Sequence, residues 1–367
     1  MNPDFVIVGA GVIGLATAWE LAAAGASVTL LDRGPAGREA SWAGAGILSP
    51  LDWDYPPAVT DLAAFGAGLY PAWTDALRAA SGIDAEYQRC GLLLLPPADF
   101  DAALTFARRA GSAAQMRRGR EVAPAIAADE SALYLADVAQ VRNPRLLRAL
   151  RGALTAAGVE LVEHCAVTGL ALSGRRCVGV RTRGGIISAG AVIVAAGAWS
   201  AALCAATDAV PEVYPVRGQM LLFKAERGLL PTIVMQGDHY LVPRRDGHIL
   251  AGATVERVGF DKSTTDSAAR GLRDFAAMVL PQLGSIEPVA HWAGLRPGSP
   301  GNVPFIGAHP TLAGLWLNCG HFRYGLTMAP GAARLLADQM LGRTPALEAA
   351  PYALRARAPA GAALGGA

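Results

Sequence analysis

At 367 residues the chain exceeds the usual size of one hydrophobic core, so we expect two domains. Hydrophobic residues make up 52% of the sequence and charged residues only 17%, a composition typical of a soluble enzyme with much buried surface. The formal net charge is +2, and no segment concentrates basic residues or interleaves them with aromatic ones. This pattern argues against a nucleic-acid partner.

The amino-terminal segment carries a glycine-rich loop, GAGVIG at residues 9–14, between an apolar run at residues 4–8 and a helical pattern that stops at Gly25. A second apolar run ends in Asp32, roughly twenty residues beyond the loop, where a carboxylate can accept hydrogen bonds from a ribose diol. Together these elements predict a dinucleotide site with the phosphates at the helix amino terminus. Asp32 argues against NADP, but the unit does not separate FAD from NAD.

The apolar stretch from Phe5 to Leu31 raises the question of a membrane span or a signal peptide. Asp4 stands where a signal peptide would be positively charged, Glu20 interrupts the stretch, and four glycines break it into strand, turn and helix. We therefore expect an uncleaved chain that is not inserted in a membrane. The five cysteines are odd in number and form no CxxC pair, which favours reduced thiols and a cytoplasmic location.

The middle of the sequence predicts a nucleotide domain that the chain leaves and re-enters. Small residues at 38–48 would let the backbone pass close to a flat ring system, although a tightly packed structural loop is an alternative. Residues 61–80 predict a helix, and another helix begins at Asn143. Residues 191–200 then read as a buried strand that runs into a glycine turn. Such an interrupted return is typical of FAD-binding proteins and is seldom needed by NAD dehydrogenases.

The next segment predicts antiparallel strands. Residues 214–224 form one expected strand, and 239–244 and 248–253 form a hairpin closed by Asp246-Gly247. Alternate side chains of such a sheet can line a substrate pocket, and Tyr240 lies on the first strand of the hairpin. Helices are expected at 264–279 and after Gly325, with the chain returning to the cofactor domain between them, near His291. The tail at 355–367 is expected to be disordered.

The combined pattern resembles the D-amino-acid oxidase family of flavoenzymes over nearly the whole chain, to about Met340. The specific motifs are WAGLRPG at 292–298 and GHFRYG at 320–325, together with residues 9–14, 41–48, 194–200 and 240–244. Within the family the likeness is greatest to members that act on glycine and are linked to thiamine biosynthesis. The resemblance implies an α/β plus α+β fold with a split Rossmann-type FAD-binding domain at 1–82, 141–212 and 290–345. A second, antiparallel-sheet substrate domain would comprise 83–140 and 213–289.

An amino-acid substrate needs its carboxylate neutralised and oriented, and a bidentate arginine does both. We expect Arg296 to be this clamp, with a surface salt bridge before a Pro-Gly turn as the alternative. The resemblance implies that Tyr240 adds a hydroxyl hydrogen bond to the carboxylate and that Arg323 reinforces the clamp. Without the resemblance, Tyr240 would read as an ordinary half-buried strand tyrosine.

The resemblance also implies non-covalent FAD, since no cysteine near Arg296 could tether the flavin. Backbone at the start of the helix after Tyr324 would stabilise the negative charge of the reduced flavin, although an ordinary core helix is the alternative. His321 is assigned a binding role, His239 a structural one, and Tyr324 replaces an asparagine of related enzymes. The expected cofactor residues are Gly9, Gly11, Val12, Ile13, Gly14, Asp32, Arg33, Ser41, Ala43, Gly44, Ala45, Gly46, Ile47, Val167, Ala196, Gly197, Trp199, His321, Arg323, Tyr324, Gly325 and Leu326.

The expected reaction is oxidative deamination of glycine or a small N-alkylglycine such as sarcosine. Dioxygen would accept the electrons, and the products would be glyoxylate, ammonia or an amine, and hydrogen peroxide. The main alternative is a flavin dehydrogenase that acts on D-amino acids or proline-like amines with another electron acceptor. A non-catalytic flavin-binding protein would need neither Arg296 nor Tyr240. The resemblance implies a homo-oligomer, specifically a homotetramer.

Overall fold

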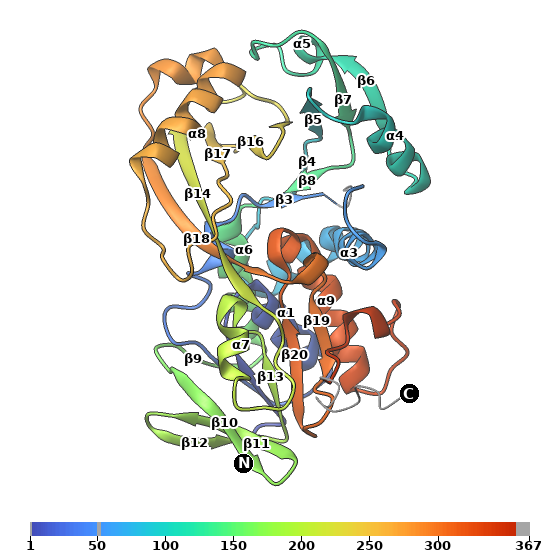
Figure 1. The fold of residues 1–367 in the computed structure, drawn as a ribbon, viewed down its shortest axis with the longest axis vertical. Coiled ribbons are helices and arrows are strands. Elements are labelled where there is room, and N and C mark those ends of the chain that lie inside the picture. The colour runs from blue at the N-terminus through green and yellow to red at the C-terminus, as the bar shows by residue number, and fades with distance from the viewer. Residues whose placement is uncertain (1, 50–52, 357–367) are drawn as a thin grey trace, which may run out of the picture.

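The computed structural model describes residues 2–49 and 53–356. Its parallel sheet occupies the lower half of Figure 1, with strand order β19-β20-β13-β1-β2-β9. All neighbouring strands in it are parallel except β19 and β20. The strands are β1 (Phe5–Val8), β2 (Val28–Leu31), β9 (Glu160–Val162), β13 (Ala191–Val194), β19 (Phe305–Ala308) and β20 (Leu315–Cys319). The sheet thus joins three distant parts of the sequence, as a split nucleotide-binding domain requires.

Four helices pack together beside the parallel sheet. They are α1 (Val12–Ala23), α3 (Pro57–Ser81), α6 (Asn143–Ala156) and α9 (Gly325–Met340). Helix α1 contacts both α6 and α9, and α3 contacts the same two helices. Leu15, Leu62, Leu150 and Ala333 are each fully buried in the shared core. Burial of these apolar faces fixes the amino terminus of α1 at the edge of the sheet, beside the glycine-rich loop.

The second large sheet occupies the upper half of Figure 1, in the order β18-β14-β17-β16-β15-β5-β7-β6. Neighbouring strands are antiparallel except β15 and β5. The strands are β5 (Leu92–Leu95), β6 (Ala114–Arg118), β7 (Ser131–Leu135), β14 (Tyr214–Lys224), β15 (Ile233–Gln236), β16 (His239–Pro243), β17 (His248–Gly252) and β18 (Ala290–Gly298). Helix α8 (Asp266–Val279) packs on one face through Phe275, while Met220 and Val242 belong to the core on the other face.

Smaller elements complete the described part of the chain. An antiparallel sheet of β10 (Val167–Ser173), β11 (Arg176–Thr182) and β12 (Gly185–Ser188) lies at the bottom of Figure 1. Strands β3 (Ile47–Leu48), β8 (Ala139–Gln140) and β4 (Gln88–Arg89) form a three-stranded sheet. The remaining helices are α2 (Ala40–Ala43), α4 (Phe100–Arg109), α5 (Gly119–Val122), α7 (Ser200–Leu203), η1 (Gly197–Trp199), η2 (Pro281–Ser285), η3 (Pro300–Asn302), η4 (Phe322–Tyr324) and η5 (Ala350–Tyr352).

The predicted fold class is confirmed, and the strand expected at 214–224 has those bounds. Strand β18 pairs along its length with β14. Residues 290–298 therefore belong to the antiparallel sheet, whereas the sequence analysis placed them with the cofactor domain. The domain boundaries remain a proposal. Of the tail expected to be disordered, residues 357–367 lie outside the described residues.

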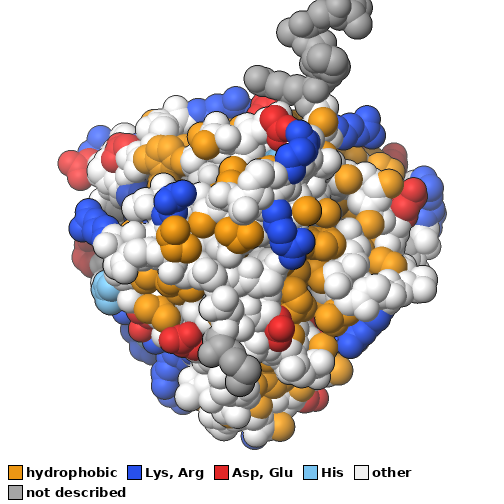
Figure 2. Space-filling view, turned by 90° about the horizontal axis from the view of Figure 1, so that it is seen from below, with side chains coloured by type: hydrophobic (Ala, Val, Ile, Leu, Met, Phe, Trp, Pro, Cys, Tyr) orange, Lys and Arg blue, Asp and Glu red, His pale blue; other side chains and the backbone are white. Residues whose placement is uncertain are grey.

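The surface mixes side chains of all kinds. On the face seen in Figure 2, basic and acidic side chains are interspersed among apolar ones. Within residues 2–49 and 53–356, no helix combines the length and the apolar character that a membrane crossing requires.

Candidate active site

Two cavities adjoin where the large sheets meet. The narrow cavity, about 390 Å³, is lined by the glycine-rich loop and the ends of the parallel strands. The wide cavity, about 960 Å³, is lined largely by the antiparallel sheet and the loops beside it. Both cavities are lined by Ala40, Gly44, Arg296, Arg323 and Leu326. A ligand in the narrow cavity can therefore extend to the wall of the wide one.

The glycines of the first loop are required by close backbone packing. Gly9 has a φ of +105°, and a Cβ there would lie 2.5 Å from the carbonyl oxygen of Ala195. A Cβ on Gly14 would lie 1.9 Å from the Gly9 carbonyl oxygen, so Gly14 packs α1 against the strand and lines neither cavity. The Ser41 hydroxyl accepts a hydrogen bond from the Val12 N–H at 2.9 Å. Helix α1 thereby presents its amino-terminal end to the narrow cavity, where it suits a phosphate.

Asp32 lies at the end of β2 and lines the same cavity. Its Oδ2 accepts from the Ala10 N–H at 2.8 Å, and its Oδ1 accepts from the Gly34 N–H at 2.9 Å. Burial raises the pKa of the carboxyl, against the lowering effect of these two hydrogen bonds. The carboxylate is thus held in one orientation, with further lone pairs on each oxygen for a ligand hydroxyl.

Aromatic and charged side chains form one end of the narrow cavity. The Arg33 guanidinium lies 3.6 Å from the centre of the Trp199 ring, and Phe260 stacks against Trp199 with ring centroids 5.4 Å apart. Arg33 also forms an ion pair with Glu39 at 2.9 Å. Trp199 and Arg33 line the narrow cavity and offer a surface on which a planar base can stack.

His321 is the clearest sign that a polar ligand belongs here. Its side chain lines the narrow cavity, and its buried Nε2 has no hydrogen-bond partner in the described residues. Burial lowers the pKa of His321 to about 3, so the imidazole is neutral at pH 7. Together with the glycine loop, Asp32 and Trp199, this orphaned nitrogen fits an elongated dinucleotide, as FAD requires.

The loop at 43–47 is fixed by two side chains that sequence reasoning did not assign to the site. The Asn143 amide donates to the carbonyl oxygens of Ser41 (2.8 Å) and Gly44 (2.9 Å). The half-buried Arg244 guanidinium donates to the Ala45 carbonyl at 2.6 Å, and desolvation lowers the pKa of Arg244 to about 10. Gly46 has a φ of +77°, and a Cβ there would lie 2.1 Å from the Val141 carbonyl oxygen. The loop between the cavities is therefore rigidly held.

The clamp predicted for a carboxylate lies in the wide cavity. Tyr240 and Arg296 both line it, and two glycines make room for them. A Cβ on Gly218 would lie 2.1 Å from Nη1 of Arg296, and a Cβ on Gly252 would lie 2.9 Å from the Tyr240 ring. Burial raises the pKa of the Tyr240 hydroxyl, while the charge of Arg296 opposes that rise. The phenol therefore stays protonated at neutral pH and can donate a hydrogen bond.

Arg323 lies at the same site but has a partner of its own. It lines both cavities, and its Nη1 donates to Asp238 at 2.9 Å. The structure thus brings Arg323 near the clamp while a carboxylate already offsets its charge. His239 does not line either cavity and its ring lies 5.1 Å from that of Phe275, on the α8 side of the sheet, as strand alternation predicts.

The other predicted cofactor residues divide between the two cavities. Tyr324 borders the wide cavity, and its ring makes an edge contact with Tyr55, with centroids 5.4 Å apart. The narrow cavity is lined by Gly9, Gly11, Val12, Ile13, Asp32, Arg33, Ser41, Gly44, Val167, Ala196, Gly197, Trp199, His321, Arg323, Gly325 and Leu326. The wide cavity is lined by Ala43, Gly44, Ala45, Gly46, Ile47, Arg323, Tyr324 and Leu326.

In the part of the chain that is described, no cluster of His, Cys, Asp and Glu could hold a metal ion.

Comparison with known proteins gives a consistent result. The family described as FAD dependent oxidoreductase, DAO, matches residues 4–339. The chain is 49% identical to glycine oxidase of Pseudomonas aeruginosa, over 96% of this chain and 99% of the relative, and 45% identical to glycine oxidase of Pseudomonas putida, over 97% and 100%. The crystal structure of glycine oxidase from Geobacillus kaustophilus superposes with a TM-score of 0.92 at 33% identity, over 96% of this chain and 98% of that one.

Replacing Trp199 by alanine should weaken binding of FAD to the apoprotein by about 5- to 30-fold, because the ring is lost and Arg33 loses the surface on which it stacks. Flavin fluorescence during titration of the apoprotein measures this affinity. Trp199→Phe keeps an aromatic face and should lose much less. Equal affinity of Trp199→Ala and wild type would show that the ring does not contact the cofactor.

The buried neutral His321 should make the protein sensitive to acid. Between pH 6.5 and about 3 the unfolded chain binds a proton that folded His321 does not, so stability falls as the pH is lowered through this range. The slope is about 1.4 kcal/mol per pH unit for one such group. Between pH 7 and 4.5 the melting temperature of His321→Gln should fall less than that of wild type. An equal fall in the melting temperatures of the variant and wild type over that pH range would contradict the assignment of a buried neutral His321.

Proposed function

Because the chain belongs to the DAO family of FAD-dependent oxidoreductases, we propose that it catalyses oxidative deamination of glycine or a small N-alkylglycine. The observation that carries this proposal is the meeting of Tyr240 and Arg296 in a cavity that shares a wall with the dinucleotide cavity. The relatives named glycine oxidase, at 49% and 45% identity over nearly the whole chain, support the substrate class.

The substrate carboxylate would lie between Arg296 and Tyr240. The guanidinium supplies charge and paired N–H donors, and the protonated phenol supplies a further hydrogen bond. Gly218 and Gly252 leave the two side chains the space to face the same ligand. Binding at two points orients the carboxylate, and such positioning of the substrate contributes to the rate.

Bound FAD would supply a hydride acceptor, so that a hydride can leave the substrate Cα while the free-base amine becomes an imine. Water then hydrolyses the imine to glyoxylate and ammonia, or to glyoxylate and a primary amine when the substrate is an N-alkylglycine. Only the deprotonated amine needs to bind, so the proposal assigns no side chain as a general base. Dioxygen is the proposed electron acceptor, with hydrogen peroxide as the second product.

The amino terminus of α9 is the backbone group best placed to favour negative charge on the cofactor. Tyr324 is the N-cap residue of this helix but makes no side-chain capping bond to it, and the first turn of the helix contains no acidic residue. Gly325 and Leu326 line the narrow cavity, so their end of the helix faces it. Unpaired N–H groups and the helix dipole there would stabilise an anionic form of the ring system.

The proposal also includes a homotetramer and a cytoplasmic location. The tetramer is supported by the family resemblance, and the location by the cysteine pattern of the sequence.

A substrate panel under air tests the proposal. Purified protein is mixed with glycine, sarcosine, longer N-alkylglycines, D-alanine and D-proline, and peroxide release is followed. We expect peroxide with glycine or sarcosine. Bleaching of the flavin without peroxide would instead indicate a dehydrogenase, and no bleaching with any of the amines would contradict the substrate class.

Replacing Arg296 by alanine should weaken substrate binding by at least about 30-fold, because a desolvated carboxylate loses its charged partner. The affinity is measured as KM for glycine and as the Kd of a carboxylate inhibitor. The variant should still bind FAD and remain yellow. A variant with wild-type affinity for both ligands would remove Arg296 from the clamp.

A further inference from the structure

Strand β14 pairs with β17 and with the segment that continues β17, and that segment contains one residue more than β14 over the same stretch. Met220 pairs with Gly252, and Arg217 pairs with Glu256. The two pairs are three residues apart on β14 but four residues apart on the segment that continues β17. Such a bulge interrupts the regular pairing and turns backbone groups away from the ladder. Thr254 lies inside this bulge.

Thr254 makes two different hydrogen bonds that a regular strand would not combine. Its hydroxyl accepts from the Gln219 N–H at 2.9 Å, in place of a backbone acceptor. Its own carbonyl oxygen is thereby released and accepts from Nη1 of Arg296 at 3.0 Å. The Arg217 carbonyl oxygen is a second, longer acceptor for the same Nη1, at 3.5 Å. The guanidinium expected to grip the substrate is thus held by backbone whose position depends on the Thr254 hydroxyl.

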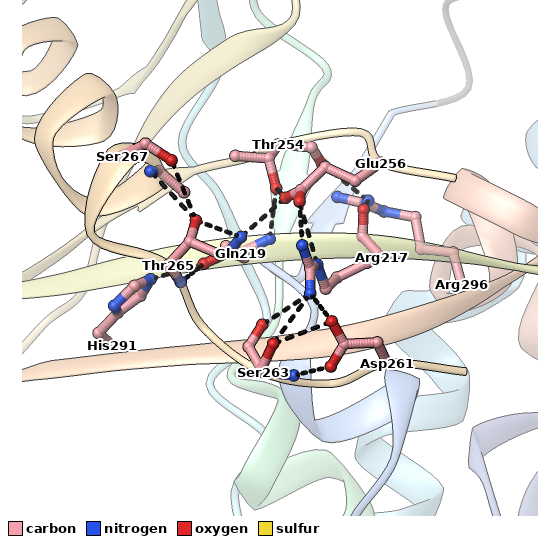
Figure 3. A network of polar contacts seen from close by, with 11 residues as sticks. Arg217, Gln219, Thr254, Glu256, Asp261, Ser263, Thr265, Ser267, His291 and Arg296 are labelled. Carbon is pink, nitrogen blue, oxygen red and sulfur yellow. Dashed lines mark hydrogen bonds and ion pairs between the residues drawn. The ribbon is translucent and has the colours of Figure 1, made fainter. Parts of the chain in front are cut away.

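Glu256 and Arg217 hold the bulge in place (Figure 3). Arg217 donates to Glu256 through Nε, at 3.0 Å, and through Nη2, and the backbones of the two residues exchange hydrogen bonds of 2.8 and 2.9 Å. The other Glu256 oxygen accepts from the Thr254 hydroxyl and from the Gln219 side chain. The Arg217 side chain is only 5% exposed and also contacts Asp261 at 2.6 Å. One carboxylate therefore joins Arg217, Gln219 and Thr254.

This network lies on the face of β14 that points away from the wide cavity. Gln219 and Arg217 line neither cavity, whereas Gly218 between them lines the wide one, as alternation along β14 requires. Gln219 further bonds Thr265, the residue that caps α8, and His291 on β18. Burial opposes ionisation of Glu256, but hydrogen bonds from Arg217, Thr254 and Gln219 outweigh it and lower its pKa. The network is therefore charged and fully paired at neutral pH.

We propose that Thr254, held by Glu256 and Arg217, is a positioning residue that fixes the Arg296 guanidinium for the substrate carboxylate. The inference rests on the proposed function, because it assigns Arg296 to carboxylate binding. Thr254 acts through Arg296 and has no contact with the reacting atoms. Loss of its hydroxyl leaves the Gln219 N–H without its acceptor. The Thr254 carbonyl is then drawn back toward the ladder and away from Arg296.

The test uses the flavin-loaded protein and glycolate, a carboxylate without an amine, whose binding is followed by the change in flavin absorbance. Thr254→Val should raise the Kd of glycolate and the KM of glycine about tenfold, the loss of one hydrogen bond to a charged group. The rate of flavin reduction at saturating glycine should stay within about twofold of wild type, and FAD affinity should not change. Thr254→Ser keeps the hydroxyl and should restore wild-type affinity. Thr155→Val, the same substitution at a residue of α6 that lines neither cavity, should alter none of these quantities.

The outcomes separate this inference from the proposed function. Wild-type glycolate affinity in Thr254→Val would overturn the inference, and so would equal losses in Thr254→Val and Thr254→Ser. If Arg296→Ala also bound glycolate as wild type does, the Arg296 clamp of the proposed function would itself fail, whatever Thr254 does. Should Thr254→Val not fold, Glu256→Gln provides the second test, since it weakens the support of the bulge while keeping a similar shape. Its glycolate Kd should rise at least threefold, and an unchanged Kd would overturn the inference.

Discussion

The site depends on the close approach of β14, β18 and α2 at two glycines that face each other. Gly218 and Gly294 are register partners in the β14–β18 ladder. A Cβ on Gly218 would enter the Arg296 guanidinium, and a Cβ on Gly294 would lie 2.5 Å from the Cβ of Ala43. Because neither residue has a side chain, the Arg296 guanidinium can lie against β14, and Ala43 of α2 can pack against β18. Trp292 strengthens this contact through its Nε1–H, which donates to the Ala43 carbonyl at 3.0 Å.

From this contact follows the arrangement of the two cavities. Arg296 borders both, so the residue that would bind the substrate carboxylate also lies at the wall of the dinucleotide cavity. Hydrogen bonds from Asn143 and Arg244 hold the loop that lies between the two cavities. The carbonyl oxygen of Thr254, in the bulge, holds the Arg296 guanidinium. The charged groups nearest the reaction are thus fixed before a ligand arrives. Such preorganisation spares the reaction the cost of orienting these dipoles.

The sequence predicted those features whose signals are local. The glycine loop with Asp32, the 214–224 strand and the Asp246-Gly247 hairpin each depend on periodicity or turn chemistry within a few residues. Features that depend on distant partners were not predictable in this way. Arg244 contacts Ala45 across 199 positions, and Arg323 meets Asp238 across 85. The pairing of β18 with β14 likewise joins distant parts of the sequence, and Gly218 and Gly294 make room there for Arg296 and Ala43, which no local pattern indicates.

The measurement that tests the account most directly is anaerobic mixing of the flavin-loaded protein with glycine and with glycine deuterated at Cα. Flavin absorbance follows the first reduction step without interference from oxygen. We expect bleaching by both substrates, slower with the deuterated one, because the Cα–H bond breaks in the step that reduces the cofactor. A flavin that stays oxidised with glycine and with sarcosine would contradict it.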